Sequence, residues 1–204
     1  MSRLVTVFFA MTILSACAGI GVFATSDPLT KLNNAVILFG EQNRPLIAER
    51  LIREAMDIYQ QKNDLLGLGH AHRNYAELLK SPAVTSHEKF YREHGFIDNS
   101  VTFDNRLEKA SEHYKKALEY YYSAEAGLQK AEQYDALTNL YYHIAWMSCS
   151  FLEKCQESCV HFDKALAAYE ANMRRNPSAK PYVPPPYKSV PEFIRVDKEH
   201  TGCQ

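Results

Sequence analysis

Apolar residues recur every three or four positions along most of the chain between residues 29 and 176, which is the period of an amphipathic α-helix. Glycine and proline are scarce inside these stretches, and no alternating run of branched and aromatic residues indicates a strand. The pattern predicts six helices: Leu29–Phe39, Leu46–Tyr59, Leu65–Leu79, Leu107–Leu128, Tyr134–Phe151 and Ser158–Met173. The expected fold class is therefore all-α.

Two segments interrupt this helical period. Pro82 and Gly95 fall within residues 81–105, which we interpret as an insertion in the helical domain 29–176. Six prolines after residue 176 predict an extended, polyproline-like path for the tail 177–204. Because the tail also contains tyrosine, valine, phenylalanine and isoleucine, we expect it to pack along the helices rather than to remain solvated.

The N-terminus has the layout of a secretory signal peptide. One basic residue, Arg3, precedes an uncharged apolar run from Leu4 to Leu14. The run is shorter than the roughly 20 residues that a membrane-spanning helix needs. We therefore assign residues 1–16 to a cleaved signal peptide.

The expected cleavage site resembles the lipobox of bacterial lipoproteins. Its residues are Leu14-Ser15-Ala16-Cys17. The resemblance implies cleavage before Cys17, a lipid on its sulfur and a tether formed by residues 17–28. Ala18 is not the aspartate that retains such proteins in an inner membrane, so we expect an outer-membrane anchor and a domain that faces the periplasm. The alternative is an ordinary signal peptide, cut after Ala24 for instance, that releases a soluble protein.

A small-large-small pattern recurs in three of the predicted helices, each time followed by a tyrosine. The three sets are Ala48, Ile52 and Ala55 with Tyr59; Ala110, Tyr114, Ala117 and Leu118 with Tyr121; and Ser158, Phe162, Ala165 and Leu166 with Tyr169. They resemble the second helix of a tetratricopeptide repeat, where small residues let neighbouring helices approach closely. Residues that match part of the first helix follow the first set: Leu65, Leu68, Gly69 and His72.

The resemblance covers roughly residues 46–176 and implies a right-handed superhelix of antiparallel helix hairpins. The successive sets are farther apart than the roughly 34 residues of a standard repeat, so the repeats must be degenerate. The alternative is a generic helical bundle in which small residues recur without a repeat.

The charge pattern argues against nucleic acid as a partner. The chain has 23 basic and 24 acidic side chains, a formal net charge of −1, and no basic block. The mature chain is long enough for one domain with a core of its own.

Cysteine usage predicts two disulfides. Removing the lipidated Cys17 leaves four cysteines in a chain expected to fold in an oxidising compartment: Cys149, Cys155, Cys159 and Cys203. We favour a bond between Cys149 and Cys159, which flank a turn predicted near Lys154. The other bond would then join Cys155 to Cys203. A metal site made from Cys155, Cys159 and His161 is the alternative, but it lacks the second ligand pair usual for zinc.

No catalytic signature is present in the mature chain. A nucleophile elbow, a phosphate-binding glycine loop, a His-Glu-x-x-His helix and a paired-cysteine zinc motif are all missing. We interpret His70 and His72 as packing or surface residues, and Glu93 and His94 as solvated. The sequence therefore predicts no enzyme, no metal and no cofactor.

Aromatic residues are the candidates for partner binding, because such side chains are enriched in binding hot spots. The insertion contributes Phe90, Tyr91, Phe96 and Phe103, and two adjacent helices contribute Tyr120, Tyr121, Tyr122, Tyr141 and Tyr142. Three consecutive tyrosines do not fit one buried helix face, so at least one should be exposed. The alternative is an aromatic core cluster.

These observations favour a lipoprotein that binds a protein partner through a helical-repeat groove, as a scaffold or adaptor of an envelope or secretion machine. An immunity lipoprotein that neutralises a toxin delivered into the periplasm, such as a type VI secretion effector, is the alternative. A small-ligand receptor or an enzyme with a pocket between helices is less favoured. The expected partners are a protein and, through the lipid, the membrane.

Overall fold

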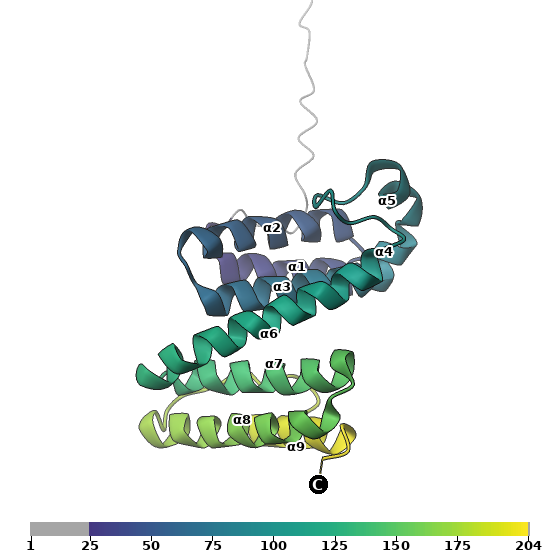
Figure 1. Ribbon diagram of the computed structural model, residues 1–204. Coiled ribbons are helices and arrows are strands. Elements are labelled where there is room, and N and C mark those ends of the chain that lie inside the picture. Colours follow the sequence, from purple (N-terminus) through teal and green to yellow (C-terminus); the bar gives the residue numbers. More distant parts are fainter. Residues whose placement is uncertain (1–24, 204) are drawn as a thin grey trace, which may run out of the picture.

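We describe the protein from a computed structural model, in which residues 25–203 are described. Within these residues the fold is all-α, as predicted, and there is no β-strand. The helices are α1 (Pro28–Gly40), α2 (Pro45–Gln61), α3 (Leu65–Lys80), α4 (Pro82–Ser86), α5 (Glu88–His94), α6 (Arg106–Lys130), α7 (Tyr134–Leu152), α8 (Cys155–Arg175) and α9 (Val190–His200) (Figure 1). The predicted signal peptide, the lipobox and Cys17 lie outside the described residues.

The six helices predicted from the periodicity correspond to α1, α2, α3, α6, α7 and α8, with ends that differ by at most three residues. Local signals mark the starts of α1, α2 and α3. Proline begins α1 and α2, where its missing N–H has no helical partner to lose. The Asp27 side chain caps α1, and Asp64 caps α3 by accepting from the backbone N–H of Gly67. None of the described helices is long and apolar enough to cross a bilayer.

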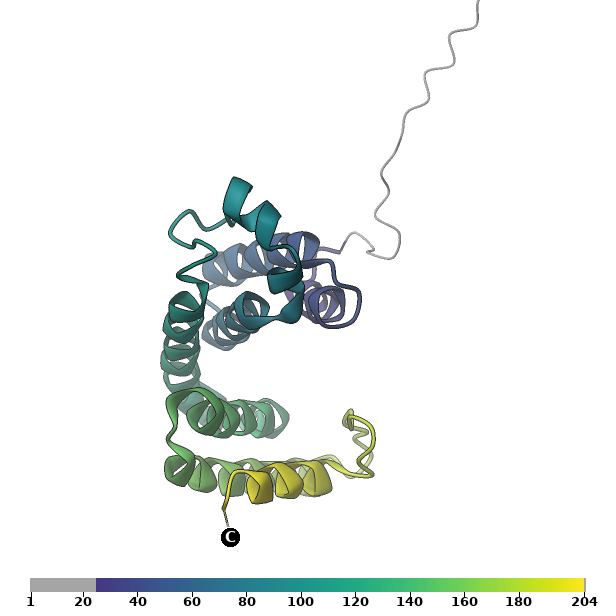
Figure 2. The ribbon, with the colours of Figure 1, turned by 90° about the vertical axis from the view of Figure 1, so that its right-hand side faces the viewer.

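Apart from the two short helices α4 and α5, each helix packs beside the next one in the chain. The contacting pairs are α1 with α2, α2 with α3, α3 with α6, α6 with α7, α7 with α8, and α8 with α9. The stack forms layers in Figure 1 and curves into a C in Figure 2. Helices α1 to α3 form one arm of the C, α7 to α9 form the other, and α6 runs along its closed side.

The core is built from the small-large-small sets found in the sequence. Their small residues, among them Ala55, Ala117 and Ala165, are fully buried in α2, α6 and α8. The large residues between them, such as Tyr114 and Phe162, are also buried. These positions therefore serve close helix packing, as the pattern indicated.

Gly69 allows α3 to lie directly against the ring of Tyr121 in α6. A Cβ atom at Gly69 would lie 2.5 Å from Tyr121 Cδ1, and that ring is fully buried. We expect Gly69→Ala to lower the free energy of unfolding by about 1–3 kcal/mol, because the ring has no free space to move into. Chemical denaturation measures this loss.

Gly127→Ala in α6 is the matched control for this substitution. No atom lies within 4 Å of a Cβ atom built at Gly127. Alanine there should leave stability unchanged or raise it by up to about 1 kcal/mol, since alanine favours a helix. Equal effects of the two substitutions would contradict the close packing of α3 on Tyr121.

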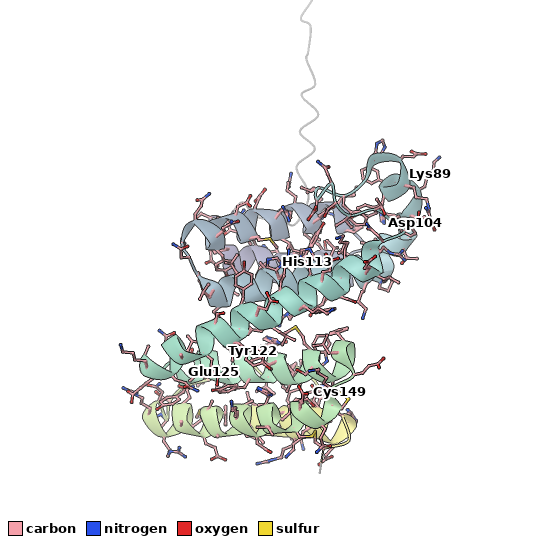
Figure 3. The ribbon with its side chains drawn as sticks, in the orientation of Figure 1. Lys89, Asp104, His113, Tyr122, Glu125 and Cys149 are labelled. Atoms are coloured by element: carbon pink, nitrogen blue, oxygen red, sulfur yellow. A yellow bond between two sulfur atoms is a disulfide. The ribbon has the colours of Figure 1, made fainter. Side chains whose placement is uncertain are left out.

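The insertion contains two short helices, α4 and α5, that the sequence analysis did not predict. Two guanidinium groups contact the Phe103 ring, with the Arg92 Cζ atom 4.7 Å and the Arg106 Cζ atom 3.9 Å from its centroid. Arg92 also pairs with Glu88 and Asp104. Lys89 and Asp104 lie on the outer edge of the insertion (Figure 3). These contacts join α5 to the segment that leads into α6.

The tail is not extended throughout, so that part of the prediction is wrong. It ends in helix α9, because Ser189 caps the backbone N–H of Glu192 and Pro191 lies in the first turn, where proline starts a helix rather than breaking one. Helix α9 packs on α8. It also contacts α7, where the Tyr142 hydroxyl donates to Asp197 at 2.6 Å.

Candidate functional site

A polar pocket of about 220 Å³ lies where α1, α3 and α7 come together. Its lining residues are Leu29, Leu32, Asn33, His70, Arg73, Asn74, Asn139 and His143. In Figure 2, α1 and α3 face α7 on the inner side of the C. Asn33 and Asn139 are exposed at the rim, whereas the Arg73 side chain is only 15% exposed. Three helices far apart in the chain therefore supply one site.

Arg73 is held in place from three directions. Its Nη2 atom donates to Asn74 Oδ1 at 2.9 Å, and its Nε atom lies 3.4 Å from the carboxylate of Glu77. Its Nη1 atom contacts both nitrogens of the His143 ring in α7. The neighbouring Asn74 in turn donates to the backbone carbonyl of Leu32 in α1. The guanidinium thus links α3 to α7, and the neighbouring Asn74 links α3 to α1.

The two histidines of the pocket are neutral at pH 7. Burial lowers the pKa of His70 to about 3, and the positive charge of Arg73 adds to this shift. Burial and Arg73 also hold the pKa of His143 well below its ordinary value. His70 Nδ1 lies 2.7 Å from the Tyr121 hydroxyl, so the His70 ring is held against α6. Arg73 is therefore the only charged residue among those that line the pocket.

Glu77 balances part of this charge one helical turn farther along α3. Burial raises the pKa of the Glu77 carboxyl, and Arg73 opposes that rise. For Arg73 itself, burial opposes the charged form, but the Glu77 carboxylate and nearby tyrosines raise its pKa overall. Arg73 therefore stays protonated at neutral pH despite its burial.

The rim of the pocket offers uncommitted amide groups. Among the described residues, the Asn33 side chain makes no hydrogen bond, and Asn139 donates only to the Asp135 carbonyl in its own helix. A side-chain amide carries both a donor and an acceptor, as a peptide group does. Two such amides, one on α1 and one on α7, suit the backbone of a bound polypeptide.

A second polar cluster connects the insertion to the helices. Glu49 of α2 accepts from the Ile97 backbone N–H at 2.7 Å and from the Tyr75 hydroxyl at 3.1 Å. Burial raises the pKa of Glu49 to about 7, although both hydrogen bonds oppose the shift. Beside it, His72 Nδ1 and His113 Nδ1 are 2.8 Å apart, between α3 and α6. Each of the three ionisable side chains is less than a tenth exposed, so this cluster is structural.

Most of the predicted partner-binding aromatics are buried. Five of the nine are in the core: Tyr91, Phe96, Phe103, Tyr121 and Tyr141. For these the expected exposed position is wrong, although Tyr91, Phe96 and Phe103 come together along a pocket of about 250 Å³ in the insertion. Tyr120 and Tyr142 are partly buried, whereas Phe90 is 37% and Tyr122 is 48% exposed. Tyr122 confirms that one of the three consecutive tyrosines is exposed; it lies on α6 in Figure 3.

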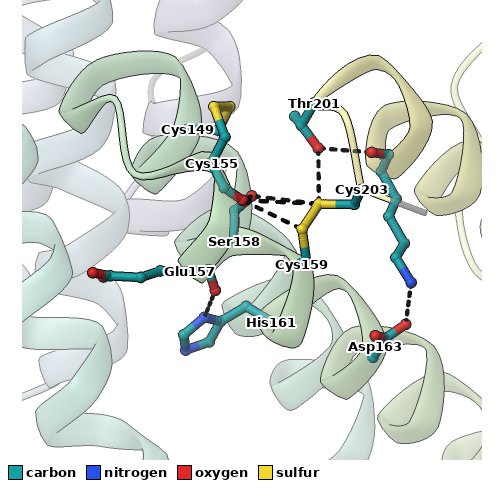
Figure 4. Close-up of a disulfide and its surroundings, with 10 residues drawn as sticks. Cys149, Cys155, Glu157, Ser158, Cys159, His161, Asp163, Thr201 and Cys203 are labelled. Carbon is teal, nitrogen blue, oxygen red and sulfur yellow. Dashed lines mark hydrogen bonds and ion pairs between the residues drawn. A yellow bond between two sulfur atoms is a disulfide. The ribbon is translucent and has the colours of Figure 1, made fainter.

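The cysteines form two disulfides, but not in the pairing that we favoured. The bonds join Cys149 to Cys155 and Cys159 to Cys203 (Figure 4). Glu153, in the left-handed conformation, ends α7, and α8 begins at Cys155, which places Cys155 beside the last turn of α7. Cys159 lies one turn farther along α8 and faces the residues that follow α9.

The alternative metal site is excluded by this pairing, since both Cys155 and Cys159 are in disulfides. Within residues 25–203, no three histidine, cysteine, aspartate or glutamate side chains are grouped closely enough to hold a metal ion. The polar pocket therefore offers an arginine, amides and two histidines.

The residues that line this pocket are not among those predicted from the sequence as a binding site. Their signal was present as polar pairs four residues apart on one helix face, such as His70 with Asn74 and Asn139 with His143. Nothing in the sequence alone shows that these faces meet, because the helices are separated by the insertion and by α6.

Comparisons with known proteins give no relative for this chain. A scan against protein families, a search of curated proteins and a search of solved structures each found no match.

Proposed function

We propose that this chain is a bacterial lipoprotein, anchored in the outer membrane through Cys17, that binds a protein partner in the groove formed by α1, α3 and α7. It acts as a scaffold or adaptor of an envelope or secretion machine. The observation that carries the proposal is the polar pocket at the point where these three helices meet.

The order of the helices supports degenerate tetratricopeptide-like repeats. The pairs α1 with α2, α3 with α6 and α7 with α8 pack in succession, and the small-large-small sets fall in the second helix of each pair. Gly69, which matches a repeat glycine, lies against Tyr121 of the same pair. We infer three hairpins in a right-handed superhelix, with α9 as the terminal cap that such arrays need.

In this arrangement the first helix of every hairpin lines the groove. Asn33 and Asn139 present amides from its two walls, and Arg73 supplies one fixed positive charge between them. Such a set of groups recognises the backbone and one polar or acidic side chain of a polypeptide segment. Binding of a segment from another protein accounts for these groups better than catalysis, because both histidines have strongly lowered pKa values.

The anchor rests on the residues before and at Cys17. Its direct test is the mass of the N-terminal peptide released from membranes: a lipid-modified Cys17 at the N-terminus is expected. An unmodified chain that begins after Ala24 would contradict it.

The groove is tested by affinity capture of the tagged, full-length protein from its own envelope. The double substitution Asn33→Arg with Asn139→Arg adds charge and bulk at the rim of the pocket, where both side chains are exposed. We expect it to abolish recovery of the partner. Ser111→Arg, at an exposed position of α6, is the matched control and should retain it. Equal recovery by both variants would contradict the groove as the binding site.

The captured proteins also separate the two roles considered for this lipoprotein. A set of envelope or secretion components would support a scaffold, whereas one stoichiometric toxin would support immunity by occlusion of the toxin.

A further inference from the structure

We propose that the open side of the C faces the membrane and that its two edges rest on the lipid surface. The inference rests on the proposed lipid anchor, and it adds an orientation of the groove that the anchor alone does not fix. Its observations are two apolar edges and the length of chain between α1 and Cys17.

The first edge is an exposed stripe on α1. Leu29 is 50%, Val36 is 37% and Ile37 is 41% exposed, although each is a large aliphatic residue. Their spacing places them on one face of the helix, which also carries the exposed Asn33. Leu29 and Asn33 both line the pocket, so this edge is part of the rim of the pocket. No described segment covers this face, whereas the opposite face of α1 packs on α2 and α3.

The second edge is the proline-rich segment of the tail, residues 177–189. Tyr182 is 81% exposed, more than any other large hydrophobic residue described. The segment is held from behind, because the Tyr187 and Phe193 rings are 5.1 Å apart and the Phe193 and Tyr142 rings are 4.8 Å apart. Figure 2 shows the loop of the tail and α1 on the same side of the molecule, at the two ends of the C.

The short tether favours the lipid bilayer as the surface that these two edges contact. Cys17 precedes Thr25, the first described residue, by eight positions. At about 3.4 Å per residue, the lipidated sulfur lies at most about 27 Å from Thr25. Helix α1 begins at Pro28 and, at about 1.5 Å per residue, is itself roughly 20 Å long. The lipid surface that holds Cys17 is therefore always within reach of the α1 stripe.

The chemistry of both edges fits the surface of a bilayer. Tyrosine is enriched at membrane interfaces, where its ring meets acyl chains and its hydroxyl stays hydrated. Aliphatic side chains lose their contact with water when they enter the same region. With both edges on the lipid, the pocket opens towards the bilayer, so the bound segment belongs to a membrane-associated partner.

The test uses tryptophan fluorescence in vesicles that contain brominated phospholipids, which quench tryptophans that touch acyl chains. Trp146 is the only tryptophan of the chain, and Trp146→Phe gives a background without tryptophan. In that background Ile37→Trp and Tyr182→Trp report on the two edges, and Lys115→Trp, at an exposed position of α6, is the control. The lipoprotein is purified from envelopes and reconstituted.

We expect quenching at positions 37 and 182 to be several-fold stronger than at position 115. Quenching at neither edge, or stronger quenching at position 115, would overturn the orientation. The mass of the N-terminal peptide is measured on the same sample. If it shows no lipid, the proposed anchor has failed, and the chain from Cys17 is instead coupled through its thiol to a maleimide phospholipid. The same comparison of quenching at positions 37, 182 and 115 then tests the orientation.

Discussion

Lowering the pH from 6.5 to 4.5 should strongly destabilise the folded protein. Four buried histidines have lowered pKa values, and for each the first cause is burial: His70, His72, His113 and His143. The values are about 3 for His70 and His72 and about 4 for His113, below the ordinary value of 6.5. The unfolded chain therefore takes up protons that the folded chain does not, and stability falls as the pH falls below 6.5.

Glu49 acts in the opposite direction over the same interval. Its pKa in the folded protein is about 7, above the ordinary 4.5. Its contribution to the free energy of unfolding is therefore complete below pH 4.5 and is lost as the pH rises towards 7. Each group changes the free energy of unfolding by at most about 1.4 kcal/mol per pH unit. Glu77, whose pKa is also raised by burial, opposes the histidines as Glu49 does, whereas His161, whose pKa is lowered by burial, adds to them. Five histidines against two carboxyls leave a net loss of up to roughly 4 kcal/mol per pH unit on acidification.

The midpoint of urea unfolding, measured at half-unit steps of pH, checks this expectation. Glu49→Gln keeps an acceptor for the Ile97 N–H but removes one of the two opposing titrations, so acid destabilisation should become steeper in this variant. A stability that is flat between pH 6.5 and 4.5 would contradict the neutral, buried state of the histidines.

Removing the Cys159–Cys203 disulfide should destabilise the protein more than removing Cys149–Cys155. The first bond closes a separation of 44 residues and fastens the end of α9 to α8, whereas the second closes a separation of only 6. The chain-entropy relation gives about 4 kcal/mol for the first and about 2 kcal/mol for the second. Serine replaces both cysteines of a pair, so that no free thiol remains.

Thermal unfolding of the two double variants measures this difference, and each serves as the control for the other. The tail segment 177–189 should also become accessible to protease in the Cys159→Ser, Cys203→Ser variant alone. If the Cys149–Cys155 pair proves the more important one, the account of how the tail is fastened is wrong.

The helices were predictable because each carries its own signal. Asp27 and Asp64 cap the helices that follow them, and the apolar period persists between such caps. Helix α9 is not predicted, because a proline-rich composition indicates an extended chain, whereas Pro191 occupies the first turn of a helix. Composition does not distinguish these two uses of proline, whereas the preceding Ser189 does.

The pocket and the disulfide pairing were harder to predict, because both depend on how distant segments pack. Arg73 contacts His143, which lies 70 positions along the chain, and no local pattern indicates that contact. Cys155 and Cys159 are one helical turn apart, so their partners depend on where α9 ends. The aromatics of the insertion were misjudged for a related reason: Tyr91 and Phe96 pack on each other in the interior, with their ring centroids 4.1 Å apart.

The most direct test of the central claim is photo-crosslinking in living cells of the native host. A benzophenone amino acid replaces Asn139 at the rim of the pocket or Lys115 on α6, both exposed positions. If the groove of α1, α3 and α7 binds a protein, position 139 should form a discrete crosslinked product of defined mass and position 115 should not. Crosslinks at position 115 alone, or at neither position, would contradict partner binding in this groove.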